Sequence, residues 1–202
     1  MTRSDRDERH SLAFFRGFLR KPEVVGSVIP SSRFLERRVV ASCELGEARC
    51  VVELGPGTGG TTRALLAAMP SQAHLLAVEV EADFVEVLAQ HEDPRLIARQ
   101  GSAEAIAELL ADNGLPAADV VVSGIPFSTI GEEAGRAVID AVWGSLAPGG
   151  RFVAYQFRDR VAQVARPRMG EPIAARELLN IPPMHVYCWR KPAAEASPAN
   201  AA

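Results

Sequence analysis

From residue 49 onward, short runs of β-branched residues alternate with longer helical patterns, and glycine or proline separates most of them. The runs with strand character cover residues 50–54, 74–79, 95–99, 118–123 and 151–157. The helical patterns between them cover residues 61–69, 82–91, 103–111 and 132–146. Such alternation is typical of βαβ units and predicts a parallel sheet with helices on both faces. Residues 174–180 and 185–191 add a hairpin-like pair of strands.

The composition of the 202 residues narrows the class of protein. A hydrophobic fraction of 48% beside 23% charged residues excludes wholesale disorder. No apolar run approaches the roughly 18 residues that a membrane-spanning helix needs, and we see no secretion signal. Cys43, Cys50 and Cys188 lack metal-ligand spacing, so we expect no metal site, no disulfide scaffold and reduced thiols in the cytoplasm.

Positive charge is concentrated at the start of the chain. Residues 1–38 hold nine basic and five acidic residues, a net charge of +4, and the remainder has a net charge of −7. On a helical wheel, Phe14, Phe15 and Phe18 share one arc while Arg16 and Arg20 lie on the other side. Such a helix can lie in the headgroup plane of an anionic membrane. Packing of its apolar face onto the sheet is the alternative.

The glycine-rich loop after the first strand is the strongest functional signal. Residues 53–60 read ELGPGTGG and lead directly into a helical pattern. Glycines at this place permit a tight turn and let a ligand approach the backbone. Taken alone, the loop is also compatible with a plain strand-to-helix turn.

Further polar segments follow the next three strands. Glu79 ends the second strand, Gly101 and Ser102 follow the third, and Ser123 ends the fourth. Because the carboxyl ends of parallel strands share one edge, where open α/β sheets bind ligands, we expect these residues to lie together. A carboxylate about 20 residues past the loop can accept both ribose hydroxyls, although Glu79 could also be a solvated strand end.

With these motifs, residues 49–191 resemble the class I S-adenosylmethionine-dependent methyltransferases. The resemblance implies a Rossmann-like α/β fold with a seven-stranded, mostly parallel sheet that contains an antiparallel strand. It implies S-adenosyl-L-methionine as the cofactor and S-adenosyl-L-homocysteine as its product. It assigns Glu53, Gly55, Gly57 and Gly59 to the methionine part of the cofactor, Glu79 to the ribose, Ser102, Ala103 and Glu104 to the adenine, and Ser123 to the border between the methyl group and the acceptor. Thr58, Val80 and Gly101 are further expected cofactor contacts.

The start of the chain narrows the resemblance. Residues 12–22 read LAFFRGFLRKP and residues 26–35 read GSVIPSSRFL. Together with SGIPFS at 123–128 and NIPP at 180–183, they are similar to bacterial phospholipid N-methyltransferases of the PmtA type. This resemblance implies stepwise N-methylation of phosphatidylethanolamine, through its mono- and dimethyl derivatives, to phosphatidylcholine. An ornithine lipid is an alternative acceptor.

The resemblance also sets an expected organisation. Residues 1–38 form a membrane-contacting segment, residues 39–192 the methyltransferase domain and residues 193–202 a disordered tail. The expected partners are the phospholipid substrate and an anionic membrane, without nucleic acid. We expect a cytoplasmic protein that is peripheral on the inner face of the cytoplasmic membrane. Ser31 and Ser32 precede a helical run and could cap it or lie close to the cofactor.

The sequence signals for the methyl acceptor are less specific than those for the cofactor. An ammonium group has no lone pair and must lose a proton before it accepts a methyl group, and the candidate bases are Tyr155 and His185, although either could be structural. A methylated ammonium suits aromatic faces, which Phe127, Tyr155 and Tyr187 could supply. Gly124 is expected beside the acceptor. Arg33, Arg158 and Arg160 are candidates for the headgroup phosphate, and the sequence does not rank them.

Two other functions remain open. Ser-Gly-Ile-Pro-Phe at 123–127 resembles the Asn-(Leu/Ile/Pro)-Pro-(Phe/Tyr) motif of adenine N6-methyltransferases that act on nucleic acids such as ribosomal RNA. Gly124 occupies the Asn position and offers no side-chain acceptor, and an isoelectric point near 5.9 disfavours a nucleic-acid surface. The other alternative is a cofactor-binding adaptor without catalytic activity.

Overall fold

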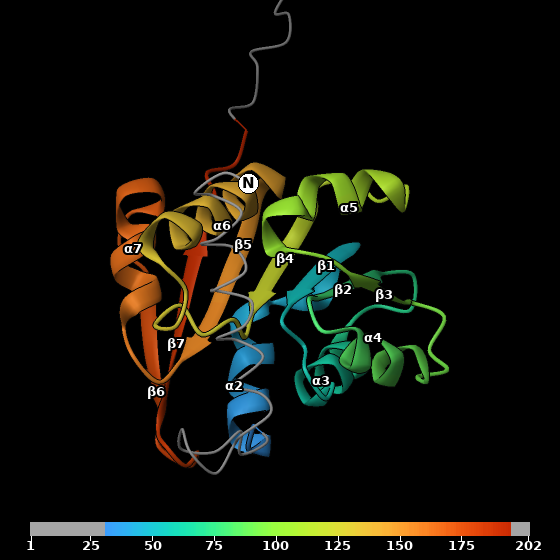
Figure 1. Ribbon diagram of the computed structural model, residues 1–202, viewed down its shortest axis with the longest axis horizontal. Helices are drawn as coiled ribbons and strands as arrows, with labels where there is room; N and C mark the ends of the chain where they lie inside the picture. Colours follow the sequence, from blue (N-terminus) through green and yellow to red (C-terminus); the bar gives the residue numbers. More distant parts are fainter. Residues whose placement is uncertain (1–30, 195–202) are drawn as a thin grey trace, which may run out of the picture.

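A seven-stranded sheet with the order β3-β2-β1-β4-β5-β7-β6 forms the centre of the protein (Figure 1). The computed structural model describes residues 31–194. Its strands are β1 (Cys50–Leu54), β2 (His74–Glu79), β3 (Leu96–Gln100), β4 (Ala118–Ser123), β5 (Leu146–Gln156), β6 (Ile173–Glu177) and β7 (Met184–Arg190). The pairs from β3 to β5 are parallel, and β7 is antiparallel to both β5 and β6. The predicted Rossmann-like sheet with an antiparallel strand is therefore confirmed.

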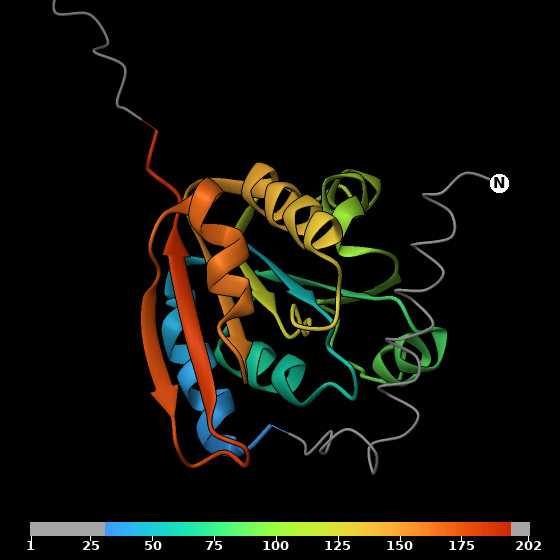
Figure 2. The same cartoon turned by 60° about the vertical axis from the view of Figure 1, so that its left-hand side comes forward.

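Helices cover both faces of the sheet (Figure 2). They are α2 (Arg33–Cys43), α3 (Gly60–Ala68), α4 (Ala82–Ala89), α5 (Ile106–Asp112), α6 (Glu132–Ser145) and α7 (Arg160–Met169), with 3-10 turns at Leu45–Glu47 and Ala103–Ala105. Buried side chains of α2 and α3 form one core cluster, and those of α5, α6 and α7 form the other. Among the described residues, no helix is long and apolar enough to cross a membrane.

The middle strands are buried on both faces, as expected for parallel strands between two helical layers. All five residues of β1 are buried, and in β2 only His74 is exposed. Their β-branched and leucine side chains supply the core without alternating polar positions. Because β1 pairs in parallel with both β2 and β4, the carboxyl ends of these three strands meet at one edge of the sheet.

Helix α2 begins at Arg33, where the Ser32 hydroxyl accepts a hydrogen bond from the Leu35 amide at 3.2 Å. The predicted capping by Ser32 is confirmed. Residues Leu35, Val39 and Cys43 of α2 are buried against the sheet. The expected domain boundary between residues 38 and 39 therefore falls inside one continuous helix. The expected amphipathic segment around residues 12–20 and the end of the tail lie outside the described residues.

Helix α7 was not expected from the sequence. Its buried side chains, which include Val161 and Val164, are small and are interspersed with arginines, and Pro167 lies within it. Strand β5 also begins earlier than predicted, at Leu146, because the Ala-Pro-Gly-Gly segment continues the strand instead of ending the preceding helix. Both differences lie away from the glycine-rich loop.

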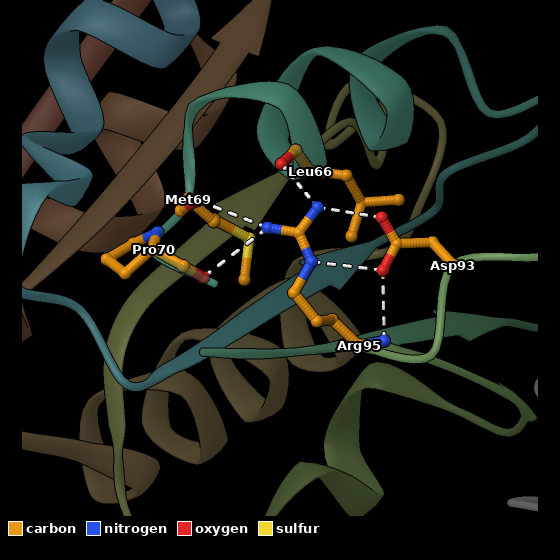
Figure 3. A network of polar contacts seen from close by, with 5 residues as sticks. All are labelled: Leu66, Met69, Pro70, Asp93 and Arg95. Atoms are coloured by element: carbon orange, nitrogen blue, oxygen red, sulfur yellow. Dashed lines mark hydrogen bonds and ion pairs between the residues drawn. The ribbon is translucent and has the colours of Figure 1, made fainter. Parts of the chain in front are cut away.

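The guanidinium of Arg95 fixes the end of α3, the helix that starts at this loop (Figure 3). It donates hydrogen bonds to the carbonyls of Leu66 at 2.8 Å and Met69 at 3.1 Å, and it pairs with Asp93 at 2.7 Å. The last carbonyls of a helix lack partners within the helix, and a cation near this end also complements the helix dipole. Arg95 thereby holds α3 in place behind the loop.

Candidate active site

The glycine-rich loop connects β1 to α3 in a left-handed backbone conformation. Gly55, Gly57 and Gly59 have φ angles of +71°, +54° and +81°, which side chains with a Cβ rarely adopt. A Cβ at Gly57 would meet no atom within 4 Å, whereas one at Gly55 would lie 3.3 Å from the Ile125 side chain. The loop therefore packs closely on the segment after β4 and is open at Gly57.

Glu79 holds this loop to the end of β2. Its side chain is buried, and its carboxylate accepts hydrogen bonds from the amides of Gly57 at 3.1 Å, Val80 at 2.8 Å and Glu81 at 3.2 Å. Burial raises the pKa of Glu79, and the three amide hydrogen bonds oppose this effect. Since a carboxylate has about four acceptor positions, one remains for a further donor such as a ribose hydroxyl.

Glu53 is fully buried at the end of β1. Its Oε2 accepts a hydrogen bond of 2.6 Å from the Thr62 hydroxyl, and its Oε1 has no partner among the described residues. Burial raises the pKa of Glu53 to about 7, although the Thr62 hydrogen bond lowers it. A buried carboxylate oxygen without a partner is unfavourable. A cationic group placed beside it would relieve this cost, so the site fits a positively charged cofactor.

The segment after β4 approaches both the loop and the end of β5. A Cβ at Gly124 would lie 2.5 Å from the Tyr155 hydroxyl oxygen and 3.1 Å from the Gly55 carbonyl oxygen. The Tyr155 hydroxyl lies 3.3 Å from that of Thr61. The structure therefore brings the predicted residues Gly124 and Tyr155 together with the glycine-rich loop, and it leaves no space for a side chain at position 124.

Tyr155 does not suit the predicted role of a phenolate base. Burial raises its pKa well above the ordinary value, and the nearby carboxylates of Glu53 and Glu36 add to this effect. The phenol therefore stays neutral at physiological pH. It can orient an acceptor nitrogen by a hydrogen bond, but it does not supply a strong base.

His185 lies on the other face of the sheet. In the β5–β7 ladder, Tyr155 pairs with Val186 and Gln156 pairs with His185. Because successive side chains of a strand point to opposite faces, Tyr155 and His185 diverge. The His185 ring stacks on Tyr187 with 5.8 Å between ring centroids, and its buried Nδ1 has no partner among the described residues. The two candidate bases thus do not converge on one acceptor.

Two of the three proposed aromatic contacts are core residues, which corrects the expectation that they face a headgroup. The exposed fraction is 1% for Phe127 and 6% for Tyr187. Phe127 packs beside Gly135 of α6, and Tyr187 packs between His185 and Trp189. Their rings therefore fill the space between the sheet and the helices α6 and α7.

The residues assigned to adenine follow β3. The Gly101 amide donates a hydrogen bond to the Glu79 carbonyl at 2.9 Å, which places the segment beside the end of β2. Ser102 caps the 3-10 turn, because its hydroxyl accepts a hydrogen bond from the Glu104 amide at 3.3 Å, and Ala103 is buried. This segment is therefore adjacent to Glu79 at the carboxyl edge of the sheet.

The start of α2 is tied to the turn between β6 and β7. The Ser32 amide donates a hydrogen bond of 2.9 Å to the Asn180 side-chain oxygen, whereas Arg33 is exposed with its guanidinium 5.0 Å from the Phe34 ring centroid. The Val80 amide donates a hydrogen bond to the Glu79 carboxylate, and Ser31 precedes the cap residue Ser32 without capping the helix itself.

Sequence reasoning missed Glu36 and Thr62. Glu36 Oε1 lies 2.9 Å from the position that a Cβ at Gly60 would take, and burial raises the pKa of Glu36. Thr62 is the partner of Glu53. A hydroxyl in the first turn of the helix after an acidic strand end was a detectable signal for Thr62. Glu36 reaches the site only through the packing of α2, which no local pattern shows.

The fold and this site define a class I methyltransferase. A family profile described as a methyltransferase domain matches residues 52–152, which is half of the chain. The protein belongs to this methyltransferase family, which supports the prediction of S-adenosylmethionine as the cofactor.

Curated relatives differ in how much of the chain they match. The chain is 29% identical over 191 residues to the ornithine lipid N-methyltransferase of Singulisphaera acidiphila, a match that covers 88% of this chain and 94% of that protein. It is 38% identical over 96 residues to ribosomal RNA small subunit methyltransferase A of Parasynechococcus marenigrum, which covers 46% of this chain and 30% of that protein. The chain thus spans about a third of the length of this second relative.

Solved structures agree with the fold. The N-methyltransferase NodS of Bradyrhizobium japonicum, in complex with S-adenosyl-L-homocysteine, superimposes with a TM-score of 0.64 at 15% identity, covering 89% of this chain and 98% of that chain. An O-methyltransferase of Bacillus cereus gives a TM-score of 0.64 at 11% identity, covering 92% and 96%. At these identities the likeness shows the architecture alone.

Proposed function

We propose that this protein transfers methyl groups from S-adenosylmethionine to the amino group of a membrane aminolipid. The observation that carries the proposal is the match to a lipid N-methyltransferase along nearly its whole length, whereas the ribosomal RNA enzyme matches over less than half of this chain. Phosphatidylethanolamine is the acceptor that the sequence motifs predict, and ornithine lipid is the one that the relative indicates. Both present an amino nitrogen to the same chemistry.

Residues on the β1–β2 side would hold the cofactor. When bound, S-adenosylmethionine supplies a methyl group on a sulfonium sulfur that reacts with a lone pair. The Glu53 carboxylate fits a cationic group, the left-handed glycines leave room for close approach, and the remaining acceptor position of Glu79 fits a ribose hydroxyl. The segment 101–104 lies next to Glu79 and would contact the adenine.

Residues on the β4–β5 side would receive the amine. Gly124 keeps side-chain atoms away from the end of β4, and the neutral Tyr155 hydroxyl stands beside it as a hydrogen-bond partner. Orientation of two reactants can contribute roughly 7–11 kcal/mol to catalysis, so a site without a strong base can still be effective. Two carboxylates lie near Tyr155, those of Glu53 and Glu36. Since Glu53 is assigned to the cofactor, Glu36, whose pKa burial raises, would take up the proton.

The adenine alternative is less compatible with this site. Adenine N6-methyltransferases of the matching motif use an Asn or Asp side chain to accept from the adenine amino group. A side chain at position 124 would clash with the Tyr155 hydroxyl and the Gly55 carbonyl. The Gly124 to Tyr155 contact therefore favours an acceptor that is not read through a side chain at this position.

The proposal is tested in a host that lacks choline and methylated ornithine lipids. Mass spectrometry of its lipids, with and without this protein, should show mass increments of one to three methyl groups on phosphatidylethanolamine or on ornithine lipid. The Glu79→Ala variant should give no increment. Unchanged lipids beside a folded wild-type protein would refute the proposal, and the lipid that gains mass identifies the acceptor. Peripheral attachment to the inner face of the cytoplasmic membrane, with contact through residues 12–20, remains part of the proposal.

A further inference from the structure

The turn between β6 and β7 exposes an apolar cluster. Leu178, Leu179 and Ile181 have exposed fractions of 65%, 63% and 75%. They are three of the six exposed large hydrophobic side chains among residues 31–194, and they lie within four positions. A cluster of this kind is costly in water unless something covers it.

Three exposed arginines lie on the two elements next to this turn. Arg33 and Arg37 are exposed on the first turns of α2, and Arg176 is exposed on β6, next to its last residue Glu177. Residues 178–191 contain no acidic residue, and Glu177 is buried and paired with Arg38 at 2.8 Å. We call these three arginines with Leu178, Leu179 and Ile181 the rim, which is apolar at its centre and cationic around it.

The rim is fixed to the candidate active site. The Asn180 side chain accepts a hydrogen bond from the Ser32 amide at 2.9 Å, which ties the turn to the start of α2. After the turn, β7 begins beside Gln156, whose side-chain oxygen accepts a hydrogen bond from the Phe127 amide at 3.3 Å. The turn and the start of α2 lie side by side in both views, at the end of the sheet where β5 finishes (Figures 1 and 2).

We propose that the rim docks onto the headgroup layer of an anionic lipid bilayer, with Leu178, Leu179 and Ile181 inserted and Arg33, Arg37 and Arg176 on lipid phosphates. The inference rests on the proposed function, since an enzyme that methylates a bilayer lipid must meet its acceptor at the membrane surface. An apolar cluster inserts into the boundary between headgroups and acyl chains, and surrounding cations add attraction to anionic lipid. This arrangement would present the headgroup to the site without removing the lipid from the bilayer.

Vesicle co-sedimentation of the full chain tests the surface. The triple variant Leu178→Ser/Leu179→Ser/Ile181→Ser should bind vesicles of phosphatidylglycerol and phosphatidylcholine at least tenfold more weakly than the wild type. The matched control is Ile173→Ser, which changes a side chain of 78% exposure at the opposite end of β6 and should leave binding within twofold. Both variants should bind S-adenosylmethionine like the wild type by calorimetry, which shows that they fold.

A charge variant and a local probe complete the test. Arg33→Gln/Arg37→Gln should lose the preference for anionic over zwitterionic vesicles, whereas Arg190→Gln at the far end of β7 should keep it. Vesicles of brominated lipid should quench the tryptophan fluorescence that Leu178→Trp adds and should leave the fluorescence that Ile173→Trp adds unchanged. This comparison reports on the rim itself, also when another segment contributes to membrane binding. Any of three results would overturn the inference. The fluorescence of Leu178→Trp is not quenched, the triple variant binds vesicles as tightly as the wild type, or the wild type forms a dimer without lipid that the triple substitution dissociates.

The outcomes separate this inference from the proposed function. If the protein methylates a detergent-dispersed aminolipid and the rim variants bind vesicles like the wild type, the proposed docking surface is refuted and the proposed function stands. Rim-dependent vesicle binding by a protein that methylates no aminolipid would refute the proposed function and leave the docking surface standing.

Discussion

The Tyr155 hydroxyl oxygen lies 2.5 Å from the point where a side chain at Gly124 would begin. The contact joins the ends of β4 and β5, and the Gly55 carbonyl completes it at 3.1 Å from the same point. Position 124 is therefore restricted to glycine by packing, although its φ angle is not in the left-handed region. Three segments of the candidate active site depend on this single close approach.

Replacement of Gly124 by alanine should damage both folding and cofactor binding. The added Cβ would also lie 3.0 Å from the Tyr155 ring carbon Cζ, so the ring or the loop must move. Overpacking of this kind costs about 1–3 kcal/mol. Chemical denaturation and calorimetry should show lower stability and at least tenfold weaker binding of S-adenosylmethionine. Gly144→Ala, where no atom lies within 4 Å of the new Cβ, is the control and should be neutral or stabilising.

Glu53→Gln should stabilise the ligand-free protein at high pH and weaken its cofactor binding. The buried carboxyl has a pKa of about 7, above its ordinary value of 4.5. Its ionisation therefore opposes folding as the pH rises above 4.5, and the cost is complete above pH 7. At pH 8 the variant should gain on the order of 3 kcal/mol, and the gain should disappear toward pH 4.5. A pH series of denaturation curves measures it, and Glu47→Gln on the surface should show no such trend. A variant as stable as the wild type at every pH would contradict the burial of a charge at this position.

Glu79→Gln should loosen the glycine-rich loop. The neutral amide keeps a carbonyl acceptor but loses the charge that three backbone amides of residues 57, 80 and 81 share. Hydrogen bonds to a charged group contribute roughly 1.5–3 kcal/mol, so both stability and cofactor affinity should fall. Calorimetry should show at least tenfold weaker cofactor binding, and the exposed Glu86→Gln on α4 should bind normally. Equal affinity in the two variants would exclude Glu79 from the cofactor site.

Arg95→Met should lower the melting temperature without touching the site directly. The substitution leaves the carbonyls at the end of α3 without their cationic donor and removes the partner of Asp93. Arg95 lowers the pKa of Asp93 to about 2, so the stability from this pair is present above pH 4 and is lost as the pH falls through 2. The difference in melting temperature from the wild type should thus shrink in acid. Arg99→Met is the control, because the exposed Arg99 guanidinium donates to the adjacent Ala98 carbonyl and not to the end of α3.

The sheet and the loop were predictable because their signals are local. Burial on both faces requires mainly apolar residues in β1, β2 and β4, with polar residues near the strand ends. The left-handed turns at Gly55, Gly57 and Gly59 favour glycine, so both features are visible in the sequence. The bounds predicted for these three strands agree with the structure. The helix α7 was harder to predict, because it buries small side chains among arginines and because Pro167 is a residue that usually marks a helix end.

For the part of the site that would bind the acceptor, the sequence could predict which residues come near but not how their side chains are oriented. The sequence places Phe127 and Tyr187 close to the carboxyl edge, but the side to which each ring turns depends on strand register and on the space beside Gly135. For the same reason the opposite orientation of Tyr155 and His185 could not be seen. Glu36 enters through the packing of α2 against α3, a contact between distant parts of the chain.

Transfer of labelled methyl groups by the purified protein tests the central claim most directly. The full chain is incubated with radiolabelled S-adenosylmethionine and, separately, with phosphatidylethanolamine vesicles, ornithine lipid vesicles and small-subunit ribosomal RNA, and Glu79→Ala serves as the inactive control. We predict that label enters at least one aminolipid and that none enters the RNA. Label in RNA alone, or in no acceptor despite cofactor binding, would contradict the account.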